Sequence, residues 1–247
     1  MKLLRMLLAQ TKMNFVWYLF RDGEMMFWAL AMPLFFLVLF SFAFGFGNTT
    51  KASAFLVPGL IGAQVLSLGF FGVGVMLAQF REQKVLRRIY LTPLPPWVFF
   101  AALVLYRLTL LAFQASVLAL AGMLLFHVRF TGHPLSIVAM LAIGALTFVS
   151  LGTLVGAVTK TAESANNLAS VLTVPLAFLS DAYIPLDRFP QAVSAPLRML
   201  PSTQFIDALR GVSTGGEPLS HFAGWIAVLI AWALAAMLLS SRLFRWV

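Results

Sequence analysis

The sequence predicts an all-α polytopic membrane protein with six transmembrane helices. Of its 247 residues, 61% are hydrophobic and only 10% are charged, whereas soluble domains carry about 25% charged residues. The apolar residues form runs long enough to span a bilayer, which takes roughly 20 residues in a helix. The net charge of +9 comes from basic residues between these runs, as in cytoplasmic loops of membrane proteins. This distribution does not form a nucleic-acid-binding stripe, so no nucleic acid is expected as a partner.

Residues 1–24 are predicted to form an amphipathic helix in the membrane interface. Their apolar positions, which share one helical face, are Leu4, Leu7, Leu8, Phe15 and Leu19, and Lys2, Arg5 and Lys12 lie elsewhere. Basic amphipathic helices of this kind lie parallel to the membrane surface. The alternative is that this segment simply begins the first span.

Six apolar runs follow within one predicted permease domain, residues 25–247. The predicted spans are 25–46, 57–80, 97–126, 134–158, 168–184 and 221–239. An even number of spans places both termini on one side of the membrane. Small residues recur at every fourth position in two of the spans, as Gly59, Ala63 and Ser67 and as Gly152 and Gly156. Such spacing allows close helix packing, which we expect inside the bundle rather than at a dimer seam.

The distribution of basic residues predicts that both termini are cytoplasmic. One side would hold eleven of them: Lys2, Arg5, Lys12, Arg21, Arg81, Lys84, Arg87, Arg88, Lys160, Arg242 and Arg245. The other side would hold five: Lys51, Arg129, Arg188, Arg198 and Arg210. The side richer in Lys and Arg is normally cytoplasmic.

A basic segment, REQKVLRRIYLTPLPP at 81–96, joins the second and third spans. It begins like an amphipathic helix and ends at a Pro-rich bend. We expect it to dock a soluble partner on the cytoplasmic face. The alternative is that its charges only fix the topology and contact lipid phosphates.

The segment between the fifth and sixth spans, residues 184–219, contains five prolines together with many apolar residues. A fully solvated loop would not need the apolar side chains. They predict either short helices that re-enter the outer leaflet, where protein must cover the broken backbone, or a small external cap on the bundle.

Four motifs occur in order along almost the whole chain. They are RDGEMMFWALAMPLFFLVLFSFAFG at 21–45, EQKVLRRIYLTPLPPW at 82–97, FLSDAYIPLDRFPQAV at 178–193 and LPSTQFIDALRGV at 200–212. Together they resemble the membrane subunit of type-2 ABC transporters, the six-span permeases of bacterial exporters. The resemblance implies a multi-pass protein of a prokaryotic cytoplasmic membrane that forms half of an export pathway with a second permease copy and contacts membrane lipids.

The resemblance also implies that separate ATP-binding cassette subunits supply the energy. The sequence contains no G-x-x-x-x-G-K-[ST] loop, the motif that holds ATP phosphates in such ATPases. We therefore expect no enzymatic activity and no cofactor on this chain, with ATP and Mg²⁺ bound by the partner subunit. Residues predicted to couple the two subunits are Glu82, Leu86, Arg87, Arg88, Ile89, Tyr90, Thr92 and Pro93.

Two further groups of polar residues are candidates for the transport pathway. Arg107 is predicted inside the third span, where a charge costs about 2.5–3.5 kcal/mol and usually faces protein or water. It would contact an anionic substrate or lipid head group, or instead extend to the cytoplasmic interface, and we favour the latter. Gln64 and Gln114 are further candidates, for which interhelical hydrogen bonds are the interpretation that we favour. A possible external gate comprises Asp181, Asp187, Arg188, Asp207 and Arg210, for which solvated loop charges are the alternative.

The sequence leaves the cargo open among hydrophobic drugs, lipids and lipid-linked glycans. Two other function classes fit the sequence less well than an exporter subunit. An intramembrane enzyme would need a nucleophile with a base, or metal ligands, facing one cavity. The three histidines, His127, His133 and His221, lie at or near the predicted outer borders of the spans and have no metal-ligand spacing. A stand-alone channel or secondary transporter often shows inverted repeats, which the sequence does not show clearly.

Overall fold

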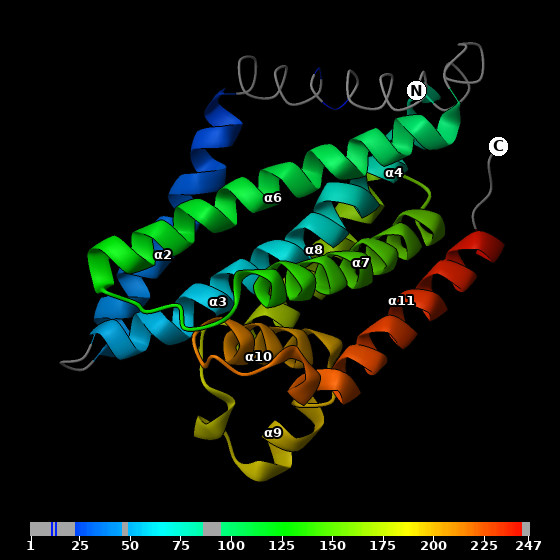
Figure 1. Cartoon of the computed structure of the whole chain (residues 1–247). Coiled ribbons are helices and arrows are strands. Elements are labelled where there is room, and N and C mark those ends of the chain that lie inside the picture. Colours follow the sequence, from blue (N-terminus) through cyan, green and yellow to red (C-terminus); the bar gives the residue numbers. More distant parts are fainter. Residues whose placement is uncertain (1–10, 12, 14–22, 46–48, 86–94, 244–247) are drawn as a thin grey trace.

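The structure, a computed structural model, describes residues 11, 13, 23–45, 49–85 and 95–243. In these residues all regular secondary structure is helical, which confirms the predicted all-α class. Long helices run back and forth through the bundle, with shorter helices gathered near one end (Figure 1). Of the predicted interfacial helix, residues 1–24, the structure describes residues 11 and 13 and residues 23 and 24, which begin α2. Thr11 Oγ1 donates a hydrogen bond of 3.5 Å to the carbonyl of Ala102.

The long helices follow the predicted apolar runs closely. Helix α2 covers Gly23–Gly45, α6 covers Pro96–Phe126, α7 covers Pro134–Val158 and α11 covers Ala223–Leu243. The second run forms one continuous helix made of α3 (Thr49–Ser67), η1 (Leu68–Val75) and α4 (Met76–Glu82). It begins eight residues before the predicted start at 57, because the segment before it is helical as well.

Four helices in the described residues are long and apolar enough to cross a membrane: Thr49–Glu82, Ala101–Phe126, Pro134–Val158 and Leu219–Leu243. The predicted number was six. The first predicted span coincides with α2, of which Leu30–Ala43 forms a shorter apolar helix. The fifth was placed at 168–184, but its helix, α8, covers Ala162–Phe178 and has only 17 residues. The chain turns after Phe178, so residues 179–184 do not extend this helix.

Glycines bring η1 and α7 into backbone contact. A Cβ atom on Gly152 would overlap the carbonyl oxygen of Gly69, and one on Gly69 would overlap the carbonyl oxygen of Phe148. A Cβ atom on Gly74 would lie 2.6 Å from the carbonyl oxygen of Gly152. Gly152 and Gly156 therefore pack inside the bundle, as the sequence predicted, because only glycine permits this separation.

The predicted external segment folds into the short helices η2 (Leu186–Arg188), α9 (Gln191–Leu197) and α10 (Pro201–Ser213), followed by η3 (Leu219–Phe222). Helix α10 packs against α3, α7 and α11 and buries Phe205, Ile206 and Leu209. The Phe205 ring lies 5.7 Å from that of Phe148 in α7. These contacts explain why the segment carries apolar residues. They fit both predicted arrangements, short re-entrant helices and an external cap, because each of them packs the segment against the bundle.

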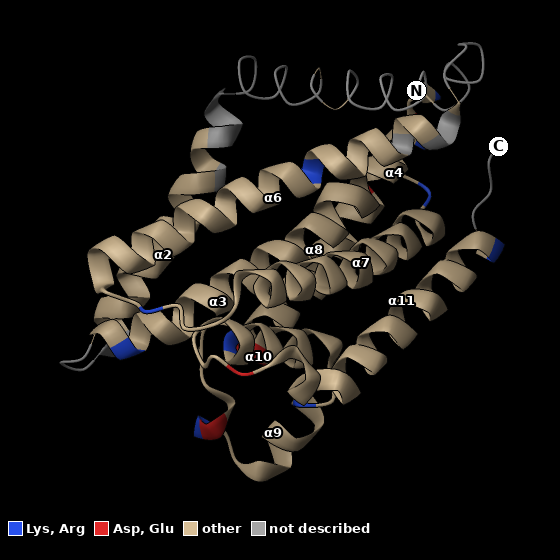
Figure 2. Ribbon diagram, in the orientation of Figure 1, with Lys and Arg blue, Asp and Glu red and all other residues tan. Residues whose placement is uncertain are grey.

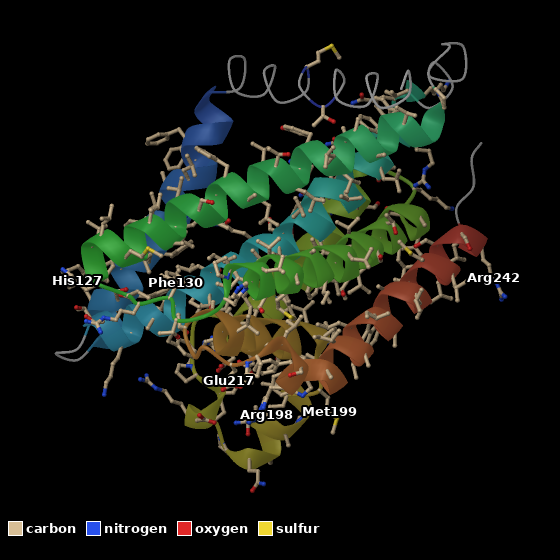
Figure 3. All side chains as sticks on the ribbon, in the orientation of Figure 1. His127, Phe130, Arg198, Met199, Glu217 and Arg242 are labelled. Atoms are coloured by element: carbon tan, nitrogen blue, oxygen red, sulfur yellow. The ribbon has the colours of Figure 1, made fainter. Side chains whose placement is uncertain are left out.

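The ends of the long helices form two opposite faces. One face holds the end of α4, the start of α6, the end of α7, the start of α8 and the end of α11 (Figure 1). Figure 3 shows Arg242 at this end of α11, with His127 and Phe130 at the opposite end of the bundle. The face that holds Arg242 is called the inner face and the face that holds His127 the outer face, after the predicted topology.

Candidate transport pathway and coupling sites

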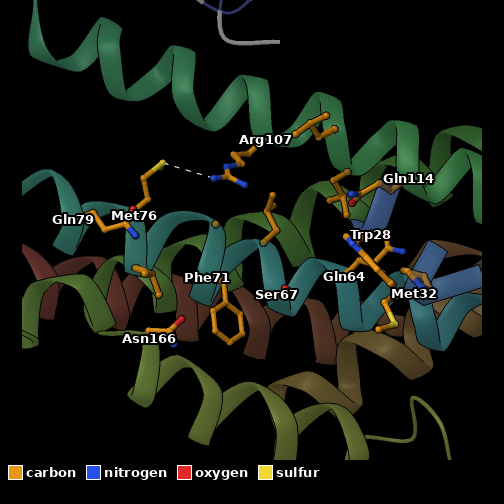
Figure 4. A pocket seen from close by; sticks show the side chains of 16 residues that line it. Trp28, Met32, Gln64, Ser67, Phe71, Met76, Gln79, Arg107, Gln114 and Asn166 are labelled. Carbon is orange, nitrogen blue, oxygen red and sulfur yellow. Dashed lines mark hydrogen bonds between the residues drawn. The ribbon is translucent and has the colours of Figure 1, made fainter. Parts of the chain in front are cut away.

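A cavity of about 530 Å³ lies between α6 and the long helix that contains η1. Three residues predicted for the substrate pathway, Gln64, Arg107 and Gln114, all line it (Figure 4). Helices α2 and α8 contribute Trp28 and Asn166 to its walls. The structure thus brings the three polar residues together around one space, while their role in transport stays a prediction.

Arg107 is the one charged residue of α6 and lies within the helix rather than at its ends. Figure 2 shows how few basic and acidic residues the long helices carry. Its Nη2 approaches the Met76 sulfur at 4.0 Å, and its Cζ lies 5.6 Å from the centre of the Tyr106 ring. Its Nε is buried and has no hydrogen-bond partner in the described part of the chain. No Asp or Glu is among the described residues that line the cavity, so none of them neutralises the guanidinium there.

The wall opposite Arg107 is η1, a π-helix that the sequence did not reveal. Its residues, LGFFGVGV, continue the apolar pattern of the flanking α-helices, and only the three glycines hint at an irregularity. Gly72 lies beside Arg107, since a Cβ atom there would be 3.8 Å from Arg107 Cδ. π-Helical turns within α-helices are frequent at functional sites.

At the inner face, Glu82 links the predicted coupling segment to α8. Its Oε2 accepts a hydrogen bond of 2.8 Å from the backbone N–H of Ala162, the first residue of α8. Thr161 caps the same helix by accepting a hydrogen bond of 3.1 Å from the N–H of Ser164. A carboxylate is favourable here because the first N–H groups of a helix lack partners and carry partial positive charge.

The segment 81–96 begins inside a long helix rather than as a separate one. Arg81 and Glu82 complete α4, and the chain turns at Gln83 and at Lys84, whose φ of 55° is left-handed. The other predicted coupling residues lie outside the described residues, and their role stays a prediction: Leu86, Arg87, Arg88, Ile89, Tyr90, Thr92 and Pro93.

At the outer face, Arg210 joins two carboxylates. Its Nη1 lies 2.5 Å from Asp181 Oδ2 and 2.7 Å from Asp207 Oδ1, and its Nη2 donates to the backbone carbonyl of Asp181. The guanidinium also covers the ring of Phe55, with Cζ 3.8 Å from the ring centre. Asp181 has a positive φ of 64° and accepts a hydrogen bond from the N–H of Leu186. This cluster ties α10 to the turn after α8 and to α3.

The pKa of Asp207 is raised from 3.8 to about 7, first because the side chain is buried. A hydrogen bond with Asp181 and the repulsion from its charge add to the rise, while Arg210 and Arg198 oppose it. Two carboxylates that share one guanidinium disfavour the state in which both are ionised.

The predicted gate also included Asp187 and Arg188. Asp187 pairs with Arg198 at 2.6 Å, where both side chains are more than half exposed, and Arg188 lies beside Asp187 in η2. The prediction included neither Arg198 nor Phe55. The pair Asp207–Arg210 has the helical i, i+3 spacing and was readable from the sequence, whereas the contacts across the fold were not.

The outer loop between α6 and α7 contains two of the histidines. His127 ends α6 with a left-handed φ of 55°, and Nδ1 of His133 accepts a hydrogen bond of 3.3 Å from the N–H of Leu135 at the start of α7. Within the described ranges there is no group of three or more His, Cys, Asp or Glu residues that could hold a metal ion.

A comparison with protein families matches residues 8–213 to the ABC-2 type transporter model. The chain belongs to the ABC-2 type transporter family. The match contains all of the cavity, the Arg210 cluster and the Glu82 contact, so each of them is part of the permease fold. It ends at Ser213, the last residue of α10.

Several bacterial proteins are similar to this ABC-2 permease. A Bacillus subtilis (strain 168) protein named as a transport permease, YvfS, is 26% identical over 91% of both chains. Nodulation protein J of Rhizobium meliloti (strain 1021) is 31% identical over 43% of this chain and 40% of its own. A protein of Escherichia coli (strain K12) named as a multidrug ABC transporter permease, YbhR, is 27% identical over 55% of this chain and 37% of its own.

Proposed function

We propose that this ABC-2 permease forms half of the translocation pathway of a bacterial ABC exporter in the cytoplasmic membrane. A separate ATP-binding cassette subunit would bind ATP and Mg²⁺ and hydrolyse the nucleotide. Membership in a permease family supports the transport role, and the cavity beside η1 supports a path for cargo through the bundle.

The observation that carries this proposal is the hydrogen bond between Glu82 and Ala162. It connects the start of segment 81–96 to α8, and α8 contributes Asn166 to the cavity wall. A partner that moves this segment would therefore also move a helix that borders the cavity. Transmission of this kind requires contiguous packed elements, and α4 and α8 are in contact.

A second copy of the chain is proposed to cover α8. This helix exposes Asn166, Asn167 and Ser164 together with Val171 and Val174. Polar side chains are costly when they face lipid, and they normally face another helix or water. A homodimer contact along α8 satisfies this requirement and places a cavity on each side of the contact.

The proposed cargo is a hydrophobic drug, a lipid or a lipid-linked glycan. Apolar side chains such as Phe71, Leu110 and Leu111 line the cavity, which supports a ligand with an apolar part. The name of YbhR mentions multidrug transport, which is consistent with the first of these classes.

Reconstitution of the permease with an ATP-binding cassette subunit tests the proposal. We expect transport of a fluorescent hydrophobic drug into proteoliposomes to require ATP hydrolysis. Glu82→Ala should retain insertion and cassette binding but lose most of the coupling between hydrolysis and transport. Replacement of Arg87 and Arg88 by Glu should weaken cassette binding itself.

Glu217→Ala is the matched control, since Glu217 is a partly exposed carboxylate at the outer face. It should leave coupling unchanged. Drug flux through the permease alone, without any nucleotide hydrolysis, would contradict the proposal and favour a channel or secondary transporter. Normal coupling in the Glu82→Ala variant would refute the role given to the Ala162 contact.

A further inference from the structure

We infer that the cavity beside Arg107 binds the anionic head group of an amphiphile, with the guanidinium as its counter-charge. The ligand class is a molecule with one phosphate or carboxylate and an apolar body. The assignment of this ligand as cargo rests on the proposed transport function, whereas the binding site itself rests on the cavity and the charge within it.

The first argument is the unbalanced charge. An arginine stays protonated at all physiological pH values, and a charge inside a span is costly unless it is paired. The described cavity wall supplies no acidic side chain, and Arg107 Nε is buried without a hydrogen-bond partner. The Met76 sulfur at 4.0 Å is only a weak acceptor. A phosphate or carboxylate would supply both the missing charge and two acceptor oxygens.

The second argument is the composition of the remaining wall. Gln64 and Gln114 offer amide groups, and the buried Gln64 Oε1 has no hydrogen-bond partner among the described residues. An amide can present either its nitrogen or its oxygen, so these residues suit a head group that also carries a hydroxyl. The apolar side chains of Phe71 and Leu110 border the same space. A polar end and an apolar body would each meet matching groups.

The third argument is position and size. Arg107 is six residues beyond Ala101, where the apolar span begins, which is about 9 Å along a helix. The hydrocarbon core is about 30 Å thick, so the head group would lie in the leaflet nearer the inner face. A volume of about 530 Å³ is in the range of roughly 300–1,000 Å³ for small-molecule sites. Gly72, beside Arg107, leaves this space open because it has no side chain.

The test uses the full-length permease alone in phosphatidylcholine nanodiscs, with empty discs as the blank. The probe is dansyl-undecanoic acid, and its uncharged methyl ester is the matched ligand. We expect the wild type to bind the acid more tightly than the ester. Arg107→Gln should weaken binding of the acid by about tenfold, as expected for one lost charged contact, and leave the ester unchanged.

Arg107→Lys should restore part of the preference for the acid, and Arg242→Gln, at the exposed end of α11, should have no effect. Gly72→Leu should weaken both ligands because it fills the cavity without changing the charge. Equal affinity of the wild type for acid and ester would overturn the inference even if no variant folds. An acid affinity that is unchanged in the Arg107→Gln variant would overturn it as well.

Nanodiscs that also contain phosphatidylglycerol identify the source of the anion. If a membrane lipid occupies the site, the difference in acid binding between wild type and Arg107→Gln disappears in these discs. If the difference persists, a soluble amphiphile is the ligand. No ATPase is present, so failure of this experiment leaves the cassette reconstitution untouched, and failure of the reconstitution leaves the binding result standing.

Discussion

Two arginines at the outer face, Arg210 and Arg198, show how burial decides what an ion pair contributes. Arg210 and its partner Asp181 are 17% and 12% exposed, whereas Arg198 and Asp187 are 58% and 85% exposed. Removal of one partner from a buried pair leaves an uncompensated charge, which costs about 3 kcal/mol or more. An exposed pair contributes less than about 1 kcal/mol, because water and salt screen it.

Arg210→Ala should therefore lower the melting temperature of the purified permease far more than Arg198→Ala does. The measurement is thermal unfolding in detergent at neutral pH, with both variants prepared in parallel. Similar melting temperatures for the two variants would show that the Arg210 cluster does not stabilise the fold.

The raised pKa of Asp207 makes a prediction about pH. Between 3.8 and about 7, Asp207 holds its proton in the folded state but has lost it in the unfolded state. Stability depends on the difference in bound protons, so the contribution of this group is fully present below pH 3.8 and is lost as the pH rises to about 7. Asp207→Asn should show a flatter melting temperature across this range. Asp187→Asn, at an exposed position, should retain the wild-type slope, and equal slopes for all three proteins would contradict the assignment.

At the residue scale, the sequence located the polar side chains of the spans but not their partners. Gln64, Arg107 and Gln114 were chosen because polar groups are rare in spans, and the fold gathers them at one cavity. Asp187 was grouped with Arg210, whereas its ion pair is with Arg198, because sequence proximity within 184–219 says little about side-chain direction in a chain of short helices. The hydrogen bond between Glu82 and Ala162 joins residues 80 positions apart, and no sequence pattern near either residue indicates it.

The crossing of η1 and α7 is a close helix contact at glycines. Gly152→Ala should separate these helices, because its Cβ would overlap the carbonyl oxygen of Gly69. We expect a melting temperature lower by several degrees and a reduced yield of folded protein. Gly224→Ala in α11 is the control, since a Cβ atom there meets nothing within 4 Å, and alanine favours a helix by up to about 1 kcal/mol. A Gly152→Ala variant as stable as Gly224→Ala would disprove the close contact.

At the element scale, apolar runs located most long helices because a bilayer requires long uninterrupted apolar segments. Helix α7 has the predicted limits, 134–158. Helix α8 was misplaced because its first turns, AESANN, are polar and were excluded from the apolar run, while the apolar residues after Phe178 belong to a turn. The π-helix could not be predicted, since its hydrogen-bond pattern leaves no mark on hydropathy.

At the scale of the whole molecule, the distribution of basic residues between the two faces predicts which loops lie in the cytoplasm. The chain contains no cysteine, so a single introduced cysteine reports one position without interference. Lys160→Cys, between α7 and α8, should react with a membrane-impermeant maleimide only from the cytoplasmic side. Arg129→Cys, in the loop between α6 and α7, should react only from outside. Labelling of Lys160→Cys in intact cells would reverse the topology and remove the basis for a cytoplasmic partner at segment 81–96.

The continuous helix Thr49–Glu82 has 34 residues, so it is about 51 Å long at 1.5 Å per residue. This exceeds the thickness of a bilayer's hydrocarbon core by about 20 Å. A helix longer than the core tilts or extends its polar ends into the aqueous phase. The lipid composition of the host membrane thereby becomes a determinant of the angle at which Glu82 and the chain beyond it are presented.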